Sequence, residues 1–200
     1  MSFELIFALF IFAFVSSITP GPNNIMLMAS GTNFGFRKSI PHLLGINIGY
    51  SMLIFSLGIG LMEVFNLFPL TKNILKSLCV GYLVYLSYRI ATSSTSVGKN
   101  EEQKSRPISF TEAMLFQWVN PKGWTMGLSA ITIYSPTNAL SSVVLVTFAF
   151  SITNFPCQCL WVLLGQQFRK LMTSSIKLRI FNYIMAGLLL LTLIQIFLIS

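Results

Sequence analysis

Charged residues are scarce in this sequence, and acidic residues most of all. Only 9% of the 200 residues are charged and just five are acidic, whereas 54% are hydrophobic and the mean hydropathy is +0.74. This composition excludes an ordinary soluble domain. It indicates an integral membrane protein, with the lipid bilayer as its surroundings.

No carboxylate falls deep inside a hydrophobic stretch. Glu4, Glu63 and Glu112 lie at the edges of such stretches, and Glu101 and Glu102 lie in a hydrophilic segment. A pore for metal cations would need hard oxygen ligands along its length. The sequence therefore argues against metal-cation transport and predicts neither a metal site nor a cofactor. It also leaves the residue that would carry a coupling proton unassigned.

Histidine occurs once, as His42, at the start of an apolar stretch. There we expect a surface or interfacial residue near the inner side of the membrane rather than a proton carrier. A single histidine at a membrane edge, without an oriented nucleophile motif, also argues against an intramembrane serine protease. We therefore expect no enzymatic activity.

Only three cysteines are present, Cys79, Cys157 and Cys159. They leave one alternative function open, a membrane thiol-redox relay, which needs two cysteines close enough to pair and reachable from alternate sides. Cys157 and Cys159 lie two residues apart on one expected helix, so they point in different directions. The favoured interpretation is that all three are small apolar packing residues.

The net charge is +8, but the basic residues are scattered over short connections rather than gathered in a stripe. This argues against nucleic acid as a partner and favours a role in membrane orientation. Most of them lie in the first, third and fifth connections: Arg37, Lys38, Arg89, Lys99, Lys104, Arg106, Arg169, Lys170, Lys177 and Arg179. Lys72 and Lys76 lie on the opposite side. We expect the cytoplasm on the basic side, with both termini non-cytoplasmic.

Six hydrophobic stretches are long enough to cross the bilayer as helices, because about 20 apolar residues span about 30 Å of hydrocarbon. They cover residues 3–28, 43–62, 74–90, 113–134, 140–164 and 180–199. The second and third are joined by an apolar connection, so five spans is the rival count. The first lacks the positive start and the small-residue cleavage pattern of a secretory signal, so we expect it to be retained as a helix.

A hydrophilic segment divides the chain near its middle. It mixes serine, glycine and both signs of charge without apolar periodicity, so residues 93–109 are interpreted as a cytoplasmic linker. Three spans then lie on each side, in residues 1–92 and 110–200. This is the layout of a transporter built from two inverted three-helix repeats. Residues 79–90 and 184–196 share a weak internal similarity that agrees with it.

Prolines interrupt two of the spans. The segment "TPGPNN" breaks the first span, and "QWVNPKGW" breaks the fourth. Because proline lacks a backbone N–H, each break is expected to leave carbonyls of the preceding turn unpaired and to begin a second helical piece with free N–H groups. Asn23 and Asn24 are expected to cap the new piece in the first span. Such breaks are tolerated where they line a cavity or are buried in protein.

The two breaks lie at similar depths, so they can meet at one level and form a binding site. The second break also contains Lys122, and a lysine deep in a span is costly unless it is paired or neutral. Proline kinks can instead serve packing alone, and Lys122 could extend towards the inner surface. The pairing of two breaks with a lysine favours a substrate site.

Three motifs occur in a fixed order: "TPGPNNIMLMASGTNFGFRKSI" near the N-terminus, "VGYLVYLSYRIATS" in the third span and "SFTEAMLFQWVNPKGW" at the start of the fourth. In these motifs the chain resembles the LysE/RhtB family of amino-acid exporters over nearly its whole length. Within that family it is most similar to the cysteine and O-acetylserine exporters. Gln195 departs from the pattern, because relatives often carry a basic residue there, which argues against a symmetric charged pair with Arg89.

The resemblance implies a secondary transporter in the bacterial cytoplasmic (inner) membrane. It would export small neutral amino acids or derivatives, of the cysteine/O-acetylserine or threonine/homoserine type, driven by a proton gradient or the membrane potential. The substrate carboxylate is expected at the N–H groups of residues 23–25 beside Lys122, and its ammonium group at the carbonyls of residues 17–19. The expected substrate-binding residues are Pro20, Gly21, Pro22, Asn23, Asn24, Gln117, Asn120, Pro121, Lys122 and Asn154.

Two further features remain open. Asn154 is followed by Pro156 in the fifth span, which predicts either a third, weaker break or a proline that serves packing. Two GxxxG motifs let helices approach closely, Gly45 with Gly49 and Gly123 with Gly127. Such motifs fit the seam of a homodimer as well as a contact within the chain.

Overall fold

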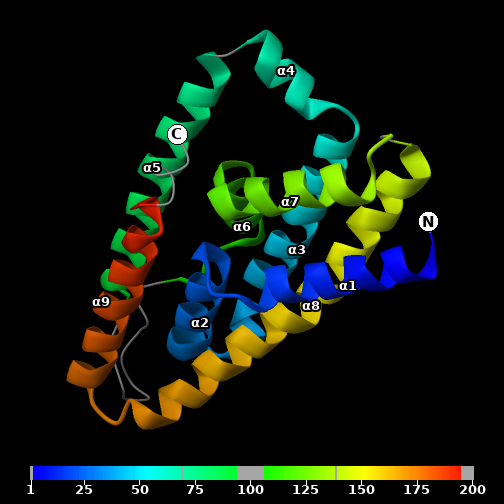
Figure 1. Cartoon of the computed structure of the whole chain (residues 1–200). Coiled ribbons are helices and arrows are strands. Elements are labelled where there is room, and N and C mark those ends of the chain that lie inside the picture. The colour runs from blue at the N-terminus through cyan, green and yellow to red at the C-terminus, as the bar shows by residue number, and fades with distance from the viewer. Residues whose placement is uncertain (1, 69, 94–105, 138, 195–200) are drawn as a thin grey trace.

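The computed structural model describes residues 2–68, 70–93, 106–137 and 139–194, and every regular element in these ranges is a helix (Figure 1). The helices are α1 (Phe3–Ile18), α2 (Pro22–Phe34), α3 (Phe36–Gly58), α4 (Leu61–Leu67), α5 (Leu70–Ala91), α6 (Phe110–Phe116), the 3₁₀ turn η1 (Gln117–Val119), α7 (Pro121–Tyr134), α8 (Leu140–Leu171) and α9 (Ser175–Leu191). Most of the expected linker and Gln195 lie outside the described residues.

Several of these helices are suited to a membrane. Within the described ranges α3, α8 and the part of α5 from Asn73 to Ala91 are each long and apolar enough to cross one. Together α1 and α2 would make a fourth span, with a bend of 55° between them. The second expected span differs in its bounds, because α3 begins at Phe36 and ends at Gly58, and α4 follows separately. The count of six spans stays a prediction.

Both predicted proline breaks are present. Helix α1 ends at Ile18 and α2 begins at Pro22, and the fourth stretch is divided between η1 and α7 at Asn120. Pro22 and Pro121 each occupy the first position of a new helix, where the missing N–H has no helical acceptor in any case. The proline positions thus set where both helices restart.

Of the two alternatives left open at Pro156, the third break is absent and the proline lies within a continuous helix. Helix α8 runs from Leu140 to Leu171 with Pro156 inside it. An internal proline costs about 3 kcal/mol or more in an isolated helix. Because α8 packs along α1, α2 and α3, this tertiary packing holds the helix together through the proline.

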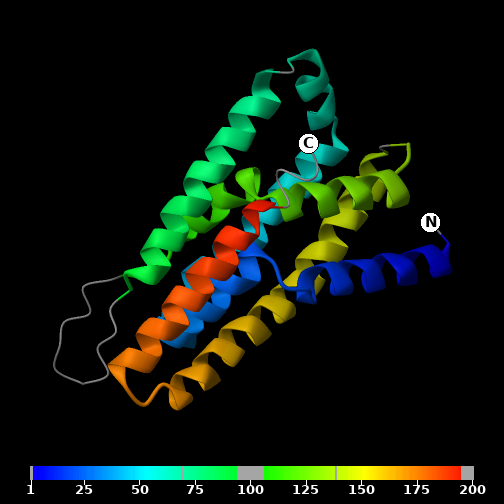
Figure 2. The ribbon, with the colours of Figure 1, turned by 60° about the vertical axis from the view of Figure 1, so that its left-hand side comes forward.

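The interior is formed by two clusters of apolar side chains. One joins α2, α3, α5, α6, α8 and α9, and the other joins α1, α3, α7 and α8. Figures 1 and 2 show α8 running beside α1 and α2, while α5 and α9 lie together on one side. Since α1 belongs to one cluster and α2 to the other, the break between them lies where the two clusters adjoin.

Glycines set how closely the helices approach. A Cβ atom on Gly31 would lie 2.1 Å from the carbonyl oxygen of Val162, and one on Gly165 would lie 2.1 Å from that of Met28, so α2 and α8 touch backbone to backbone. On α3, Cβ atoms at Gly45 and Gly49 would strike carbonyl oxygens of α6 at 2.3 and 2.6 Å. That GxxxG motif is therefore used within the chain.

Basic residues gather at one end of the bundle. The end of α2, the start of α3, the ends of α5 and α8 and the start of α9 all lie there in both views (Figures 1 and 2). Gly35 alone separates α2 from α3, with a φ of 77° that favours glycine. Arg169 of α8 donates to the carbonyl oxygens of Thr32 (3.0 Å) and Asn33 (2.6 Å) and so satisfies the last turn of α2.

The α2–α8 contact predicts a sharp response to a single methyl group. Gly165→Ala should lower the free energy of unfolding by about 1–3 kcal/mol, because the Cβ atom would overlap backbone that cannot move aside. Gly187→Ala is the matched control, since a Cβ atom there meets nothing within 4 Å. Thermal unfolding of the two purified variants in detergent checks this, and equal melting temperatures would contradict the close approach.

Candidate functional site

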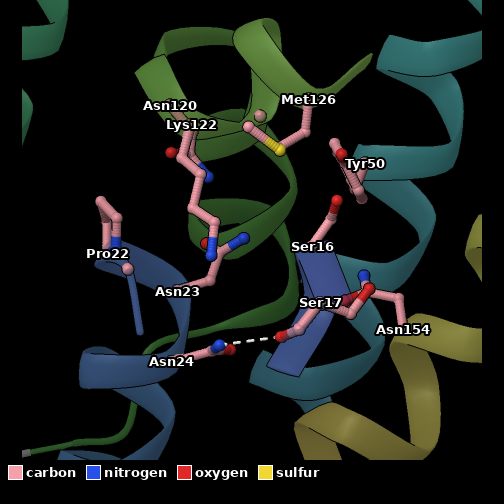
Figure 3. Close-up of a pocket in the computed structure, with 12 residues that line it drawn as sticks. Ser16, Ser17, Pro22, Asn23, Asn24, Tyr50, Asn120, Lys122, Met126 and Asn154 are labelled. Atoms are coloured by element: carbon pink, nitrogen blue, oxygen red, sulfur yellow. Dashed lines mark hydrogen bonds between the residues drawn. The ribbon is translucent and has the colours of Figure 1, made fainter. Parts of the chain in front are cut away.

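The two helix breaks meet and line a partly open pocket (Figure 3). Its space of about 390 Å³ includes the part open to solvent. The lining residues come from α1, the start of α2, α3, α7 and α8: Ser16, Ser17, Gly21, Pro22, Asn23, Asn24, Tyr50, Asn120, Lys122, Gly123, Met126 and Asn154. The predicted meeting of the two breaks is therefore confirmed.

Asn24 joins the two sides of the first break. Its side-chain amide donates to the carbonyl oxygens of Ser17 (2.9 Å) and Thr19 (2.8 Å), which end α1. Figure 3 shows the first of these bonds. The indole of Trp161 donates to the carbonyl oxygen of Ile18 at 3.2 Å. The prediction that these three carbonyls are unpaired is wrong, because side chains of α2, α7 and α8 donate to them where the hydrogen bonds of α1 end.

Lys122 reaches across from α7 to the same helix end. Its Nζ donates to the carbonyl oxygen of Thr19 at 2.7 Å, to the Thr19 hydroxyl at 3.0 Å and to the carbonyl oxygen of Pro20 at 3.4 Å. A helix C-terminus carries partial negative charge and attracts cations. Lys122 therefore lies against the broken backbone instead of extending to a membrane surface.

Gly21 makes room for this lysine. A Cβ atom at position 21 would lie 2.7 Å from Cδ and 3.3 Å from Nζ of Lys122. Gly21 is also the N-cap of α2, and no side chain caps this helix. The prediction that Asn23 and Asn24 act as caps is wrong, because both side chains bind other partners.

Asn23 pairs with Gln117 across the two breaks. Its amide donates to Oε1 of Gln117 at 2.8 Å, and the amide of Gln117 donates back at 3.1 Å and also to the carbonyl oxygen of Ala113 at 2.9 Å. Within α2 the N–H of Ile25 already donates to the carbonyl oxygen of Gly21 at 3.0 Å. The first-turn N–H groups of Asn23 and Asn24 precede this first helical bond.

Two acceptors in the pocket lack a protein partner. Oδ1 of Asn120 and Oγ of Ser17 are buried and form no hydrogen bond among the described residues. Nδ2 of Asn120 donates a hydrogen bond to Oε1 of Gln117 at 3.4 Å. An unsatisfied buried oxygen is costly, so these atoms suit a ligand that donates hydrogen bonds.

Most of the predicted site residues line the pocket. Seven do so: Gly21, Pro22, Asn23, Asn24, Asn120, Lys122 and Asn154. The other three do not line it. The carbonyl oxygen of Pro20 accepts a hydrogen bond from Lys122, Gln117 pairs with Asn23, and Pro121 is the first residue of α7.

Five residues that line the pocket were not among the binding residues predicted from the sequence. Ser16, Ser17, Tyr50, Gly123 and Met126 also line the pocket. The two serines directly precede the first break, a signal that was present in the sequence. Tyr50 and Met126 face the pocket only because α3 and α7 pack beside it, which no local pattern indicates.

His42 is not a surface residue. Its side chain is fully buried, and Nδ1 lies 2.9 Å from the hydroxyl oxygen of Ser30. The prediction of an interfacial histidine is wrong, because α3 begins at Phe36 and places residue 42 on the face that packs against α2 and α6.

The three cysteines are free thiols and line neither the pocket nor the second cavity described below. Cys79 lies on α5, whereas Cys157 and Cys159 lie on α8. Cys79 and Cys157 are buried.

Comparison with known proteins gives a consistent result. The model of the LysE type translocator family matches residues 14–199. The chain is 31% identical over 174 residues, which cover 86% of this chain and 87% of the relative, to the cysteine/O-acetylserine efflux protein of Escherichia coli strain K12. The same values hold for the cysteine/O-acetylserine efflux protein of Shigella sonnei strain Ss046. No solved structure matches the chain.

The two hydrogen bonds that the Asn24 amide donates predict that its loss will destabilise the protein. Asn24→Leu should lower the free energy of unfolding by about 1–3 kcal/mol, because it removes the donor to two carbonyl oxygens of the broken backbone. Asn73→Leu on an exposed position of α5 is the control. Thermal unfolding in detergent measures both, and an unchanged melting temperature for Asn24→Leu would show that the break does not need this amide.

Proposed function

The chain belongs to the LysE family of translocators, and we propose that it exports small neutral amino acids or their derivatives, of the cysteine/O-acetylserine type, from the cytoplasm. One observation carries the proposal beyond the family: a pocket at the meeting of two helix breaks, with one cation and two unpartnered oxygens in its wall. Binding sites of many secondary transporters are built from such discontinuous helices.

We infer an architecture of six spans in two inverted repeats. The first half, residues 1–92, would contribute α1 with α2, α3 and α5, and the second half, residues 110–200, would contribute α6 with α7, α8 and α9. Residues 93–109 would link them. Contacts of α3 with α8 and of α5 with α9, together with one broken helix in each half, support this arrangement.

The orientation follows from the basic end of the bundle. Helix ends that carry Arg37, Lys38, Arg89, Arg169 and Lys177 gather on one side (Figures 1 and 2). Cytoplasmic connections are enriched in lysine and arginine. We therefore assign this side to the cytoplasm of a bacterium, with both termini on the far side of the inner membrane.

The substrate carboxylate is assigned to the start of α2. No side chain caps this helix, so the N–H groups of Asn23 and Asn24 and the positive end of the helix dipole are available to an anion. Lys122 adds a full positive charge beside Gly21. A carboxylate at this point would meet both backbone donors and a countercharge.

The substrate ammonium group is assigned to neutral oxygens. The carbonyls at the end of α1 already accept bonds from Asn24, Trp161 and Lys122, so they are not the site that the sequence suggested. Oδ1 of Asn120 and Oγ of Ser17 have no partner in the part of the chain that the structure describes, and each can accept one N–H bond.

This wall favours a neutral amino acid over a dibasic one. Among the described residues that line the pocket, Lys122 carries the only charge. A zwitterion brings one carboxylate to Lys122 and one ammonium group to the two oxygens. A second cation on the substrate side chain would find no counterion and would be repelled by Lys122. Tyr50 and Met126 supply apolar surface for a small side chain.

Efflux from preloaded proteoliposomes tests the proposal. The panel is cysteine, O-acetylserine, threonine, homoserine and lysine, each with and without a protonophore. We expect efflux of neutral members that depends on the proton gradient or the membrane potential, and the least efflux for lysine. Equal rates for empty and protein-containing vesicles with every neutral member would overturn the assignment.

Lys122→Met should reduce export of the neutral substrate while the protein still inserts in the membrane. A hydrogen bond to a charged group contributes about 1.5–3 kcal/mol, which corresponds to roughly 10- to 150-fold in affinity. Lys170→Met, on an exposed turn at the end of α8, is the charge-matched control. Initial efflux rates normalised to inserted protein measure the effect, and a fully active Lys122→Met variant would refute the role of this lysine.

A further inference from the structure

The single histidine of the sequence lies inside the bundle and outside the pocket. His42 is fully buried on α3, and its Nε2 atom forms no hydrogen bond among the described residues. Nδ1 faces the hydroxyl of Ser30 on α2 at 2.9 Å. Histidine is the side chain whose ordinary pKa, about 6.5, lies closest to physiological pH. A buried imidazole with one free ring nitrogen is therefore able to bind and release a proton.

Ser30 connects this ring to a second cavity. The cavity holds about 310 Å³ of empty space, and its wall includes Ser30 and Asn33 of α2, Arg89 and Ser93 at the end of α5, and Arg106. It lies at the basic end of the bundle, which we assigned to the cytoplasm. The hydroxyl of Ser30 thus lies between the ring of His42 and a polar space on that side.

The charges that act on the ring come from two helices. Glu112 of α6 and Arg89 of α5 both interact with it, while α2 carries no titratable side chain. Glu112 accepts bonds from Arg89 and Arg106, each at 2.8 Å, so this group has a net positive charge. Removal of the ring from water disfavours its charged form, so the conformation described here carries the neutral ring.

Glu112 is not itself suited to carry the proton. Desolvation raises the pKa of its carboxyl, but hydrogen bonds from Arg106 and Ser109 and the charge of Arg89 outweigh this and lower the pKa of Glu112 to about 2. The carboxylate stays ionised at every physiological pH. His42 is the only imidazole in the sequence, and it is buried with Nδ1 against Ser30, which lines the second cavity.

We propose that His42 is the proton-binding residue that couples export to the proton gradient, and that Ser30 relays its proton to the cytoplasmic cavity. The proposal rests on the exporter function proposed above. Nε2 takes up a proton from the non-cytoplasmic side when the bundle opens there. The imidazolium then gives its Nδ1 proton to Oγ of Ser30, while the Ser30 hydroxyl gives its own proton to water in the cavity. The ring is left with its proton on Nε2, and a flip of the imidazole restores the starting tautomer before the next cycle. One proton enters and one leaves.

Two transport assays separate coupling from substrate handling. Proteoliposomes with the membrane potential clamped at zero by potassium and valinomycin are given a pH gradient, and net transport of O-acetylserine or cysteine is measured. In parallel, exchange of labelled for unlabelled substrate is measured at equal pH on both sides, where no net proton movement is needed.

His42→Gln should lose gradient-driven transport by a factor of about 100, the lower range of proton-transfer contributions, while exchange stays close to that of the unmodified protein. Ser30→Ala retains the His42 imidazole, and it should slow gradient-driven transport but not exchange. Ser39→Ala is the control, because this buried serine of α3 bonds only the carbonyl oxygen of Gly35.

The outcomes are distinct. Gradient-driven transport by His42→Gln at the unmodified rate overturns the proposal. So does loss of exchange together with gradient-driven transport in a stable variant, or an unmodified protein that the pH gradient does not drive. If His42→Gln fails to fold, Ser30→Ala decides, and full gradient-driven transport by that variant overturns the relay. Absence of exchange in the unmodified protein refutes the exporter function instead.

Discussion

The structure depends on one constraint: backbone groups freed at a helix break inside a membrane need partners within the protein. At the first break the chain meets this constraint with side chains from three different helices. Asn24 donates from α2, Lys122 from α7 and Trp161 from α8, all to carbonyl oxygens at the end of α1. The break is therefore a junction that fixes the positions of four helices. The pocket lies at this junction, where the side chains that donate to the end of α1 come together.

Helix α8 packs closely around this junction. Gly31 and Gly165 bring the backbones of α2 and α8 into contact, and the same packing carries α8 through Pro156 without a break. The carbonyls of α1 are already occupied, so our proposal assigns substrate recognition to atoms without a partner among the described residues. It places the ammonium group at the Asn120 and Ser17 oxygens and the carboxylate at the uncapped start of α2.

Helix α2 relates the substrate pocket to the proposed proton site. Asn24 lies in its first turn and Ser30 follows six residues later, a distance of about 9 Å at 1.5 Å per residue. The pocket and the Ser30–His42 contact are thus carried by one helix that is held tightly against α8. A shift of α2 would change both sites together, because a helix moves as a unit between packed neighbours.

The sequence alone determined the membrane class, both breaks and most of the pocket wall, because composition and proline positions act through local backbone chemistry. Pro22 and Pro121 each begin a helix, and the Asn, Gly and Lys residues beside them place polar groups in an apolar stretch of sequence. Tertiary structure decided which partners those atoms chose. Asn24 could have capped its own helix but reached back to α1, and His42 could have faced the surface but is buried against Ser30. Each choice depends on which distant helix lies opposite, and that is fixed by packing across the whole bundle rather than by neighbours along the chain.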